Sequence, residues 1–180
     1  MFRLDAVLKA VWRLVLVIPF SAHAFFDEPA SNDYNEELET PWVELEAQVK
    51  ALPREEDLVE VDLGKLPPNM KLHLDLPHLE VGEDTVTRTW MVARSGSGAY
   101  NASYEGLRCS TREYKVYAYY NPKRSKPLRI IELPGWKPVR AGSYRAELMK
   151  YVLCNGLAAE SVERIADNIA QDFSSFRLPY

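Results

Sequence analysis

The chain has 180 residues, of which 22 are lysine or arginine and 26 are aspartate or glutamate, so its formal net charge at pH 7 is −4. This length suits one compact domain with a hydrophobic core of its own. The acidic excess argues against a nucleic-acid partner, because phosphate backbones are bound by clustered lysine and arginine, and it disfavours an anionic membrane surface for the same reason.

The first 24 residues follow the pattern of an export signal. The basic residues Arg3, Lys9 and Arg13 precede an apolar run at 14–20, and an A-x-A motif ends at Ala24. A retained membrane anchor is the alternative, but a spanning helix needs about 20 apolar residues, and the basic side chains interrupt this one. We therefore predict a removable signal peptide (1–24), a periplasmic location and no transmembrane segment after cleavage.

Two kinds of segment follow the predicted cleavage point. Residues 25–40 are acidic and polar and show no repeating apolar face, which predicts a flexible N-terminal arm. Residues 41–180 are predicted to form a single domain. At its start, Trp42, Leu45 and Val49 fall roughly on one stripe, which indicates a short helix running to Lys50.

Five segments then have the character of β-strands. The first two alternate apolar and polar residues, which predicts strands with one solvated face, and the next is rich in threonine and valine. A Ser-Gly-Ser-Gly sequence at 95–98 indicates a tight hairpin connection. The predicted strands are 59–63, 72–76, 85–94, 99–109 and 111–120.

The spacing of apolar residues changes to helical near the C-terminus. Four prolines make 121–138 a loop with at most one edge strand, at 128–133. Helices are predicted at 144–153, where Ser143 can serve as the N-cap, and at about 161–173. Strands first and helices last indicate an α+β fold, with a single antiparallel sheet of about five strands packed against two C-terminal helices.

Cys109 and Cys154 are the only two cysteines of the chain. A pair of cysteines in an exported protein indicates one disulfide bond. A catalytic thiol is the alternative, but it needs a nearby base, and neither cysteine has a histidine close in sequence. We therefore expect the disulfide Cys109–Cys154.

The motif from Asn101 to Glu113, together with 81–84 and 92–99, resembles the cryptic neisserial protein-like family of exported proteobacterial proteins. The similarity runs from about Trp42 to the helix that carries Cys154. The resemblance implies a Gram-negative source and a location in the cell envelope, and it supplies no activity. Some members resemble lipoproteins, from which this chain departs because no cysteine follows its signal.

A block rich in arginine and aromatic residues is the main candidate for a binding site. Such side chains on one sheet face can bind a carboxylate, a sugar or a peptide through bidentate hydrogen bonds and stacking. The alternative is a set of structural cross-strand pairs. The candidate ligand- or partner-binding residues are Arg88, Arg94, Asn101, Tyr104, Glu105, Arg108 and Arg112.

Two other groups of residues are candidates, one for a metal site and one for a cofactor or nucleophile motif, and neither is predicted to have that function. His73, Asp75 and His78 could approach one another, but zinc needs three or four ligands with supporting groups, and Pro77 bends the chain, so we expect a solvated face and no metal. No cofactor motif is present: the serines at 95–98 fit neither a nucleophile elbow nor a phosphate loop.

Three function hypotheses remain open. The leading one is a non-catalytic envelope protein that binds a partner protein or a cell-wall component through the sheet face and loops around 94–104. The second is a glycan- or peptidoglycan-acting enzyme that uses Glu105 and Glu113, the one carboxylate pair worth testing. The third is an assembly role for the acidic arm at 25–40.

Overall fold

The computed structural model of the chain describes residues 41–171 with the exception of 65 and 68. The predicted signal peptide and acidic arm lie outside the described residues. Within the described part, no helix is long and apolar enough to cross a membrane.

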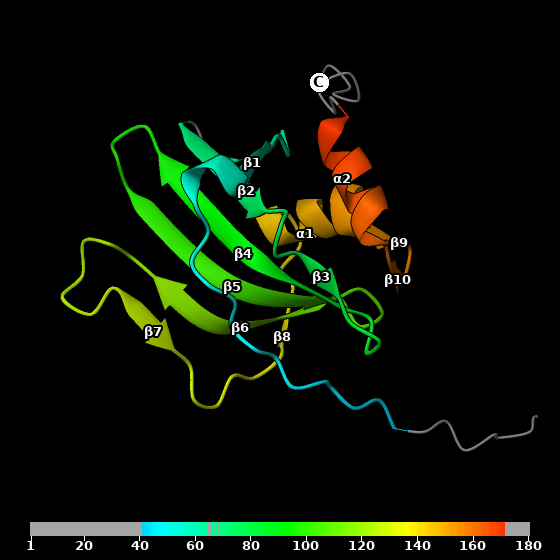
Figure 1. The fold of residues 1–180 in the computed structure, drawn as a ribbon. Coiled ribbons are helices and arrows are strands. Elements are labelled where there is room, and N and C mark those ends of the chain that lie inside the picture. Colours follow the sequence, from blue (N-terminus) through cyan, green and yellow to red (C-terminus); the bar gives the residue numbers. More distant parts are fainter. Residues whose placement is uncertain (1–40, 65, 68, 172–180) are drawn as a thin grey trace, which may run out of the picture. The chain divides into compact units, whose positions relative to one another are not determined.

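One antiparallel sheet of eight strands forms the centre of the fold (Figure 1). Its main path runs in the order β1-β2-β4-β5-β6-β7, while β3 pairs with β4 and β8 pairs with β6. The strands are β1 (Leu58–Val61), β2 (Met70–Asp75), β3 (Glu80–Val81), β4 (Val86–Ser95), β5 (Tyr100–Arg108), β6 (Glu113–Tyr120), β7 (Leu128–Ile130) and β8 (Lys137–Pro138).

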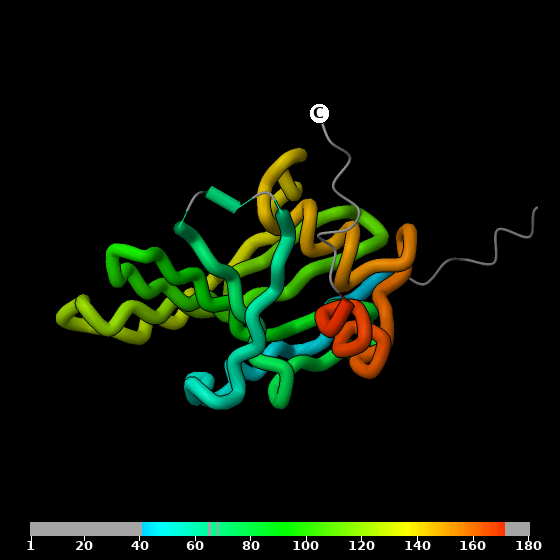
Figure 2. Tube along the Cα trace, turned by 90° about the horizontal axis from the view of Figure 1, so that it is seen from above, coloured from blue at the N-terminus to red at the C-terminus, as the bar shows by residue number. Residues whose placement is uncertain are grey.

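The three C-terminal helical elements lie together on one side of this sheet, as Figures 1 and 2 show. They are α1 (Tyr144–Leu148), the π-helix η2 (Met149–Leu153) and α2 (Val162–Ala170). The short 3-10 turn η1 (Glu55–Asp57) precedes β1 and lies outside this group. A small sheet of β9 (Cys154–Asn155) and β10 (Ala158–Ala159) connects η2 to α2. Serine side chains at positions 143 and 161 accept hydrogen bonds from the first turns of α1 and α2.

Both faces of the sheet are buried, each against a different layer. On the helix side, Leu74, Met91 and Leu107 pack against residues of η2 and α2. On the opposite side, Trp90 and Tyr104 belong to a second cluster, which is covered by residues 41–53. We call this segment the strap, because it crosses the sheet without forming a helix or a strand.

The predicted fold class was therefore wrong. The sheet has eight strands instead of about five, a second sheet of two strands is present, and the helices are short. The additional strands β3, β8, β9 and β10 have two residues each, too few for an alternating pattern to appear in the sequence. Their pairing is fixed by tertiary neighbours, and the predicted helix 144–153 changes to π-helical winding after Leu148.

The predicted helix at 42–50 was also wrong. The backbone groups that a helix would pair internally bond to the sheet instead: Leu45 N donates to the Asp84 carboxylate at 2.9 Å, and the Trp90 indole donates to Lys50 O at 3.1 Å. The apolar residues that indicated a helical stripe therefore lie along an extended chain.

The strands are more buried than their alternation predicted. In β2, whose alternation predicted one solvated face, His73 and Asp75 are buried. β4 is buried at every position from Val86 to Val92, because the helical layer covers one of its faces and the strap covers the other. In β6 the alternation is broken by a bulge, since Tyr104 pairs with Ala118 and Glu105 pairs with Val116. The residue skipped between them, Tyr117, turns to the strap side.

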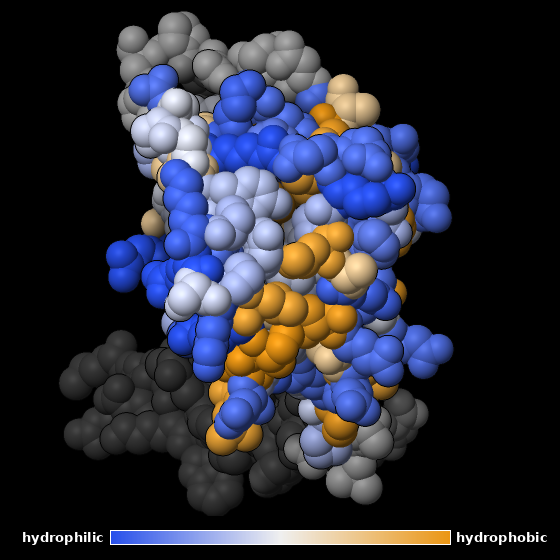
Figure 3. Space-filling model, turned by 60° about the vertical axis from the view of Figure 1, so that its left-hand side comes forward, coloured by the Kyte–Doolittle hydropathy of each residue, from blue (hydrophilic) through white to orange (hydrophobic). Residues whose placement is uncertain are grey.

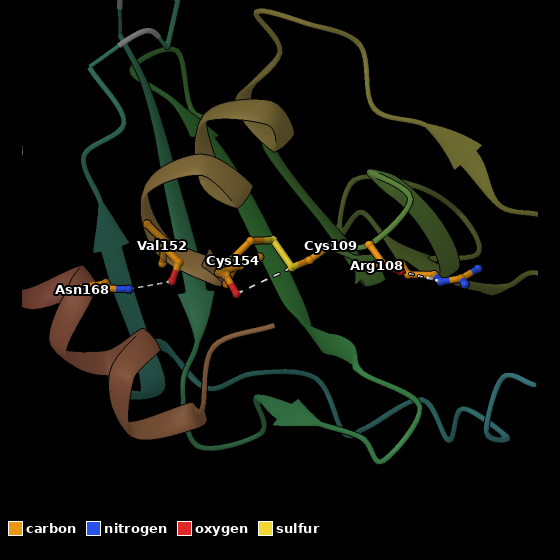
Figure 4. The surroundings of a disulfide bond; sticks show 7 residues. Arg108, Cys109, Val152, Cys154 and Asn168 are labelled. Atoms are coloured by element: carbon orange, nitrogen blue, oxygen red, sulfur yellow. Dashed lines mark hydrogen bonds between the residues drawn. A yellow bond between two sulfur atoms is a disulfide. The ribbon is translucent and has the colours of Figure 1, made fainter. Parts of the chain in front are cut away.

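The disulfide Cys109–Cys154 is present, which confirms that prediction. It joins the residue after β5 to the first residue of β9, as Figure 4 shows. Next to it, the Asn168 side chain of α2 donates a hydrogen bond to Val152 O at 3.0 Å. The disulfide bond thus connects the helical layer to β5, a central strand of the sheet.

Candidate functional site

Arg88, the first residue of the predicted binding block, is buried under the strap with 3% of its surface exposed. Its guanidinium donates to both carboxylate oxygens of Asp84, at 3.1 and 2.5 Å, and to Leu45 O at 3.3 Å. Burial alone would lower the pKa of Arg88, but the bonds to Asp84 outweigh it and raise the pKa above its ordinary value. Arg88 therefore fixes the strap to the sheet and is closed to ligands.

A second charged group that attaches the strap to the sheet is Glu44, which belongs to the strap itself. Its carboxylate accepts hydrogen bonds from Lys115 at 2.5 Å, from the Tyr117 hydroxyl at 2.7 Å and from the Trp136 indole at 3.1 Å. Burial alone would raise the pKa of Glu44, but these donors hold it below its ordinary value. The strap is thus attached by charge-assisted bonds at two points.

Glu105, the candidate catalytic carboxylate, is fully buried on the helix side of the sheet. Arg145 of α1 binds it in a bidentate manner with two contacts of 2.6 Å, and the Ser103 hydroxyl donates to it at 2.5 Å. The Arg145 guanidinium also lies 4.1 Å from the centre of the Tyr114 ring. Every feature of this group is that of a buried structural ion pair.

Glu105 and Glu113 do not form a pair. Glu113 is opposite Arg108, three positions along β5 from Glu105, and residues three apart on a strand point to opposite faces. The Glu113 carboxylate instead accepts a hydrogen bond from the Thr111 hydroxyl at 2.7 Å. The two carboxylates are therefore separated by the sheet.

The other central residues of the predicted block are occupied by internal contacts. Tyr104 is fully buried and packs on Trp90 and Tyr117 with ring centres 5.5 and 5.9 Å apart. Arg108 lies over the Trp42 ring of the strap at 3.7 Å. Arg112 is exposed, but it lines a small hollow beside the disulfide, away from the rest of the block.

The predicted histidine and aspartate group is only partly assembled. His78 lies 2.8 Å from the buried Asp75 carboxylate, Nδ1 to Oδ2. His73 points to the strap side of β2, where burial, followed by the positive charge of Arg94, lowers its pKa. No cluster of three or more metal-ligating side chains occurs among residues 41–171, leaving aside 65 and 68, which the structure does not describe.

A hollow of about 600 Å³ lies at the end of the sheet that carries the β4–β5 hairpin and the loop from β6 to β7. Figures 1 and 2 both show these two loops extending at the same end of the sheet. The Asn121 side chain donates to Asn101 Oδ1 at 2.8 Å and so joins the two strands at the hollow. The residues that line the hollow include Asn101, Tyr119, Tyr120, Arg124, Lys126 and Arg129.

The cations of residues 121–129, three of which line this hollow, are not neutralised by carboxylates of the described residues. Lys123, Arg124, Lys126 and Arg129 are exposed, and no ion pair joins any of them to a residue of the described part of the chain. The Arg129 guanidinium lies over the Tyr119 ring, 5.3 Å from its centre. The loop thus presents, beside two tyrosines, four positive charges that no carboxylate of the described residues neutralises.

Two members of the predicted block lie near this hollow. Asn101 lines it directly. Arg94 lies over the Tyr100 ring at 5.3 Å, and Tyr100 in turn packs edge-on against Tyr120. Arg94 is already paired with Glu55 at 2.5 Å, so Asn101 is the member whose side chain the hollow uses.

Residues 121–129, which we call the basic loop, were not predicted from the sequence as a binding site, because the net charge of the whole chain is negative. Residues 114–146 hold eight basic side chains and a single acidic one, Glu132. This local asymmetry is visible without a structure, and it is the signal that could have found the loop.

Comparison with known proteins gives one match. The model of the CNP1-like family matches residues 37–170, which is most of the chain. No curated protein and no solved structure matches. By this match, the chain belongs to the CNP1-like family.

Proposed function

We propose that this protein is a non-catalytic binding module of the cell envelope, which holds carboxylate groups of a partner protein or a cell-wall component at the hollow beside the basic loop (residues 121–129). The observation that carries the proposal is the set of four exposed cations that form no ion pair with a carboxylate of the described residues. Arginine and lysine beside tyrosine rings bind carboxylates by charge-assisted hydrogen bonds, and the rings shield those bonds from water.

A location outside the cytoplasm is part of this proposal. The disulfide Cys109–Cys154 supports it, since such bonds persist in oxidising compartments. The predicted signal peptide at 1–24 and the resemblance to exported proteobacterial proteins point to the periplasm. N-terminal sequencing of the protein purified from its native host tests this, because cleavage would leave Phe25 as the first residue, whereas an intact Met1 would contradict it.

The glycan-acting enzyme finds no support in the geometry of the carboxylates. Glu105 is held by Arg145, and Glu113 lies on the other face of the sheet. Glycoside hydrolysis by two carboxyl groups needs both of them to flank one scissile bond, which this arrangement does not provide. The proposed function therefore rests on binding alone.

Binding to poly-L-glutamate, a simple carboxylate polymer, tests the proposal. We expect micromolar binding by the full chain that weakens as salt is raised, and at least a tenfold loss in the double variant Arg124→Glu/Lys126→Glu. The control Lys137→Glu/Arg140→Glu makes the same change of charge outside the basic loop and should bind within about twofold of wild type. Equal losses in both variants would show that only net charge matters and would contradict the proposal.

A further inference from the structure

β7 forms an outer edge of the main sheet, with β6 as its single strand partner among the described residues. Ile131 N donates to Tyr117 O at 2.8 Å and Asn121 N donates to Pro127 O at 2.9 Å, so residues 127, 129 and 131 direct their backbone groups toward β6. In an antiparallel pair the intervening residues direct theirs outward. The N–H and C=O groups of Leu128 and Ile130 therefore form an open edge.

The side chains of the same two residues are apolar and accessible. Leu128 is 44% exposed and Ile130 is 52% exposed. Both lie on the strap side, because their cross-strand partners are Tyr120 and Ala118.

A shallow hollow of about 310 Å³ continues from Ile130 to the strap. Its apolar lining consists of Leu45, Ala47, Val49, Ile130, Ile131 and Pro134. Figure 3, which brings the left-hand side of Figure 1 forward, shows apolar side chains gathered in one patch between polar ones. An open strand edge and an apolar surface thus adjoin each other.

We propose that β7 accepts an extended segment of a partner polypeptide as an added strand, with apolar residues beside Leu128 and Ile130 and an acidic residue beside Arg129. The inference rests on the proposed function, because it names the source of the carboxylates at the same end of the sheet. Main-chain hydrogen bonds to the edge give affinity in this mode of recognition, and alternate side chains give specificity.

The charges around β7 place the acidic residue of the partner. Arg129 pairs with Tyr119 and lies on the opposite side of the strand from Leu128 and Ile130. On the strap side the hollow is instead bordered by the exposed carboxylates of Glu46 and Glu132. An acid is therefore favoured beside Arg129 and repelled on the apolar side, which predicts an apolar–acidic–apolar pattern.

The same charges disfavour a second copy of this chain as the occupant. Two β7 strands paired antiparallel about their centre would place Arg129 directly opposite Arg129 of the other copy. Like charges in directly opposed positions destabilise a strand pair. A heterologous strand with an acid at that position has no such repulsion.

Selection of linear ten-residue peptides from a phage-displayed library, on the full chain with its disulfide intact, tests the proposal. We expect the selected peptides to share the apolar–acidic–apolar pattern and to compete with poly-L-glutamate. Ile130→Pro removes an outward N–H and no bond to β6, so it should weaken binding of a selected peptide at least tenfold, whereas Ile130→Val should stay within about twofold.

N-methylation of the peptide amides tests the same contact without altering the protein. Methylation at the acidic residue and at its two neighbours, one position at a time, should include a position that weakens binding at least tenfold. Selected peptides without the pattern, or full tolerance of both the methyl groups and Ile130→Pro, would overturn strand addition. If poly-L-glutamate still bound in that case, the proposed function would stand. If poly-L-glutamate did not bind to protein with an intact basic loop, the proposed function itself would have failed.

Purified peptidoglycan sacculi separate the two sources of carboxylates. The proposal predicts that sacculi do not sediment the protein at concentrations at which the selected peptides bind. Sedimentation that is lost in Arg124→Glu/Lys126→Glu and unchanged in Ile130→Pro would assign the basic loop to the cell wall and overturn the polypeptide partner.

Discussion

The arginines that pair with buried carboxylates and the cations of the basic loop are the same kinds of side chain in different surroundings. Arg88 and Arg145 are held by carboxylates that are themselves buried, Asp84 and Glu105. The cations of residues 121–129 face water and have no carboxylate partner among the described residues. A cation already neutralised by its own protein stabilises the fold, and one that is not remains free to bind an anion.

The largest effect is expected where one partner of a buried pair is removed. Arg145→Met leaves the carboxylate of Glu105 buried without its cation, which should reduce the free energy of unfolding by about 3 to 5 kcal/mol. The matched double variant Glu105→Gln/Arg145→Met removes both charges and should recover part of that loss. Urea denaturation measures both, and a loss below about 1 kcal/mol in the single variant would mean that the pair is not structural.

Removal of the disulfide tests how much the covalent link between the helical layer and the sheet contributes to stability. The bond joins cysteines 45 positions apart, and its removal in Cys109→Ser/Cys154→Ser should lower the free energy of unfolding by about 2 to 4 kcal/mol. Wild-type protein should lose a similar amount in reducing buffer, while the double variant should not respond to the reductant. A reductant response in the variant would contradict the assignment of the effect to this bond.

A smaller, pH-dependent effect is expected at the strap. Because the folded-state pKa of Glu44 lies below 4.5, its contribution to stability is present above pH 4.5 and is lost as the pH falls through the folded value. Glu44→Gln should lower the free energy of unfolding by about 1 to 2 kcal/mol at pH 7. It should also reduce the dependence of stability on pH below 4.5, which urea denaturation from pH 7 to pH 3 would show; an unchanged dependence would contradict the role of Glu44.

Much of the sheet could be predicted from the sequence, because long strands carry a pattern that depends only on neighbouring residues. The central hairpin from 85 to 109 consists of such strands. The disulfide between Cys109 and Cys154 could also be predicted, because these are the only two cysteines of the chain. The strap could not be predicted, since its extended path depends on side chains of Asp84 and Trp90 about 40 positions away. Once the strap covers the sheet, strands that alternate in sequence become buried on both faces.

The candidate site shows the limits of composition as a guide. Arg88, Tyr104 and Glu105 have the residue types of a binding surface, yet their partners lie on distant segments, so the sequence did not reveal that they were occupied. Asn101 is the predicted residue that the structure places at the hollow beside the basic loop. The loop itself was hidden by the acidic residues elsewhere in the chain.

The most direct test of the account compares stability and binding in one variant. In Arg124→Glu/Lys126→Glu the free energy of unfolding should stay within about 0.5 kcal/mol of wild type, because neither side chain has a partner among the described residues. Its affinity for poly-L-glutamate should fall at least tenfold. A variant that keeps wild-type affinity, or one that loses stability as Arg145→Met is expected to, would contradict the claim that the loop cations serve binding and the buried ones serve the fold.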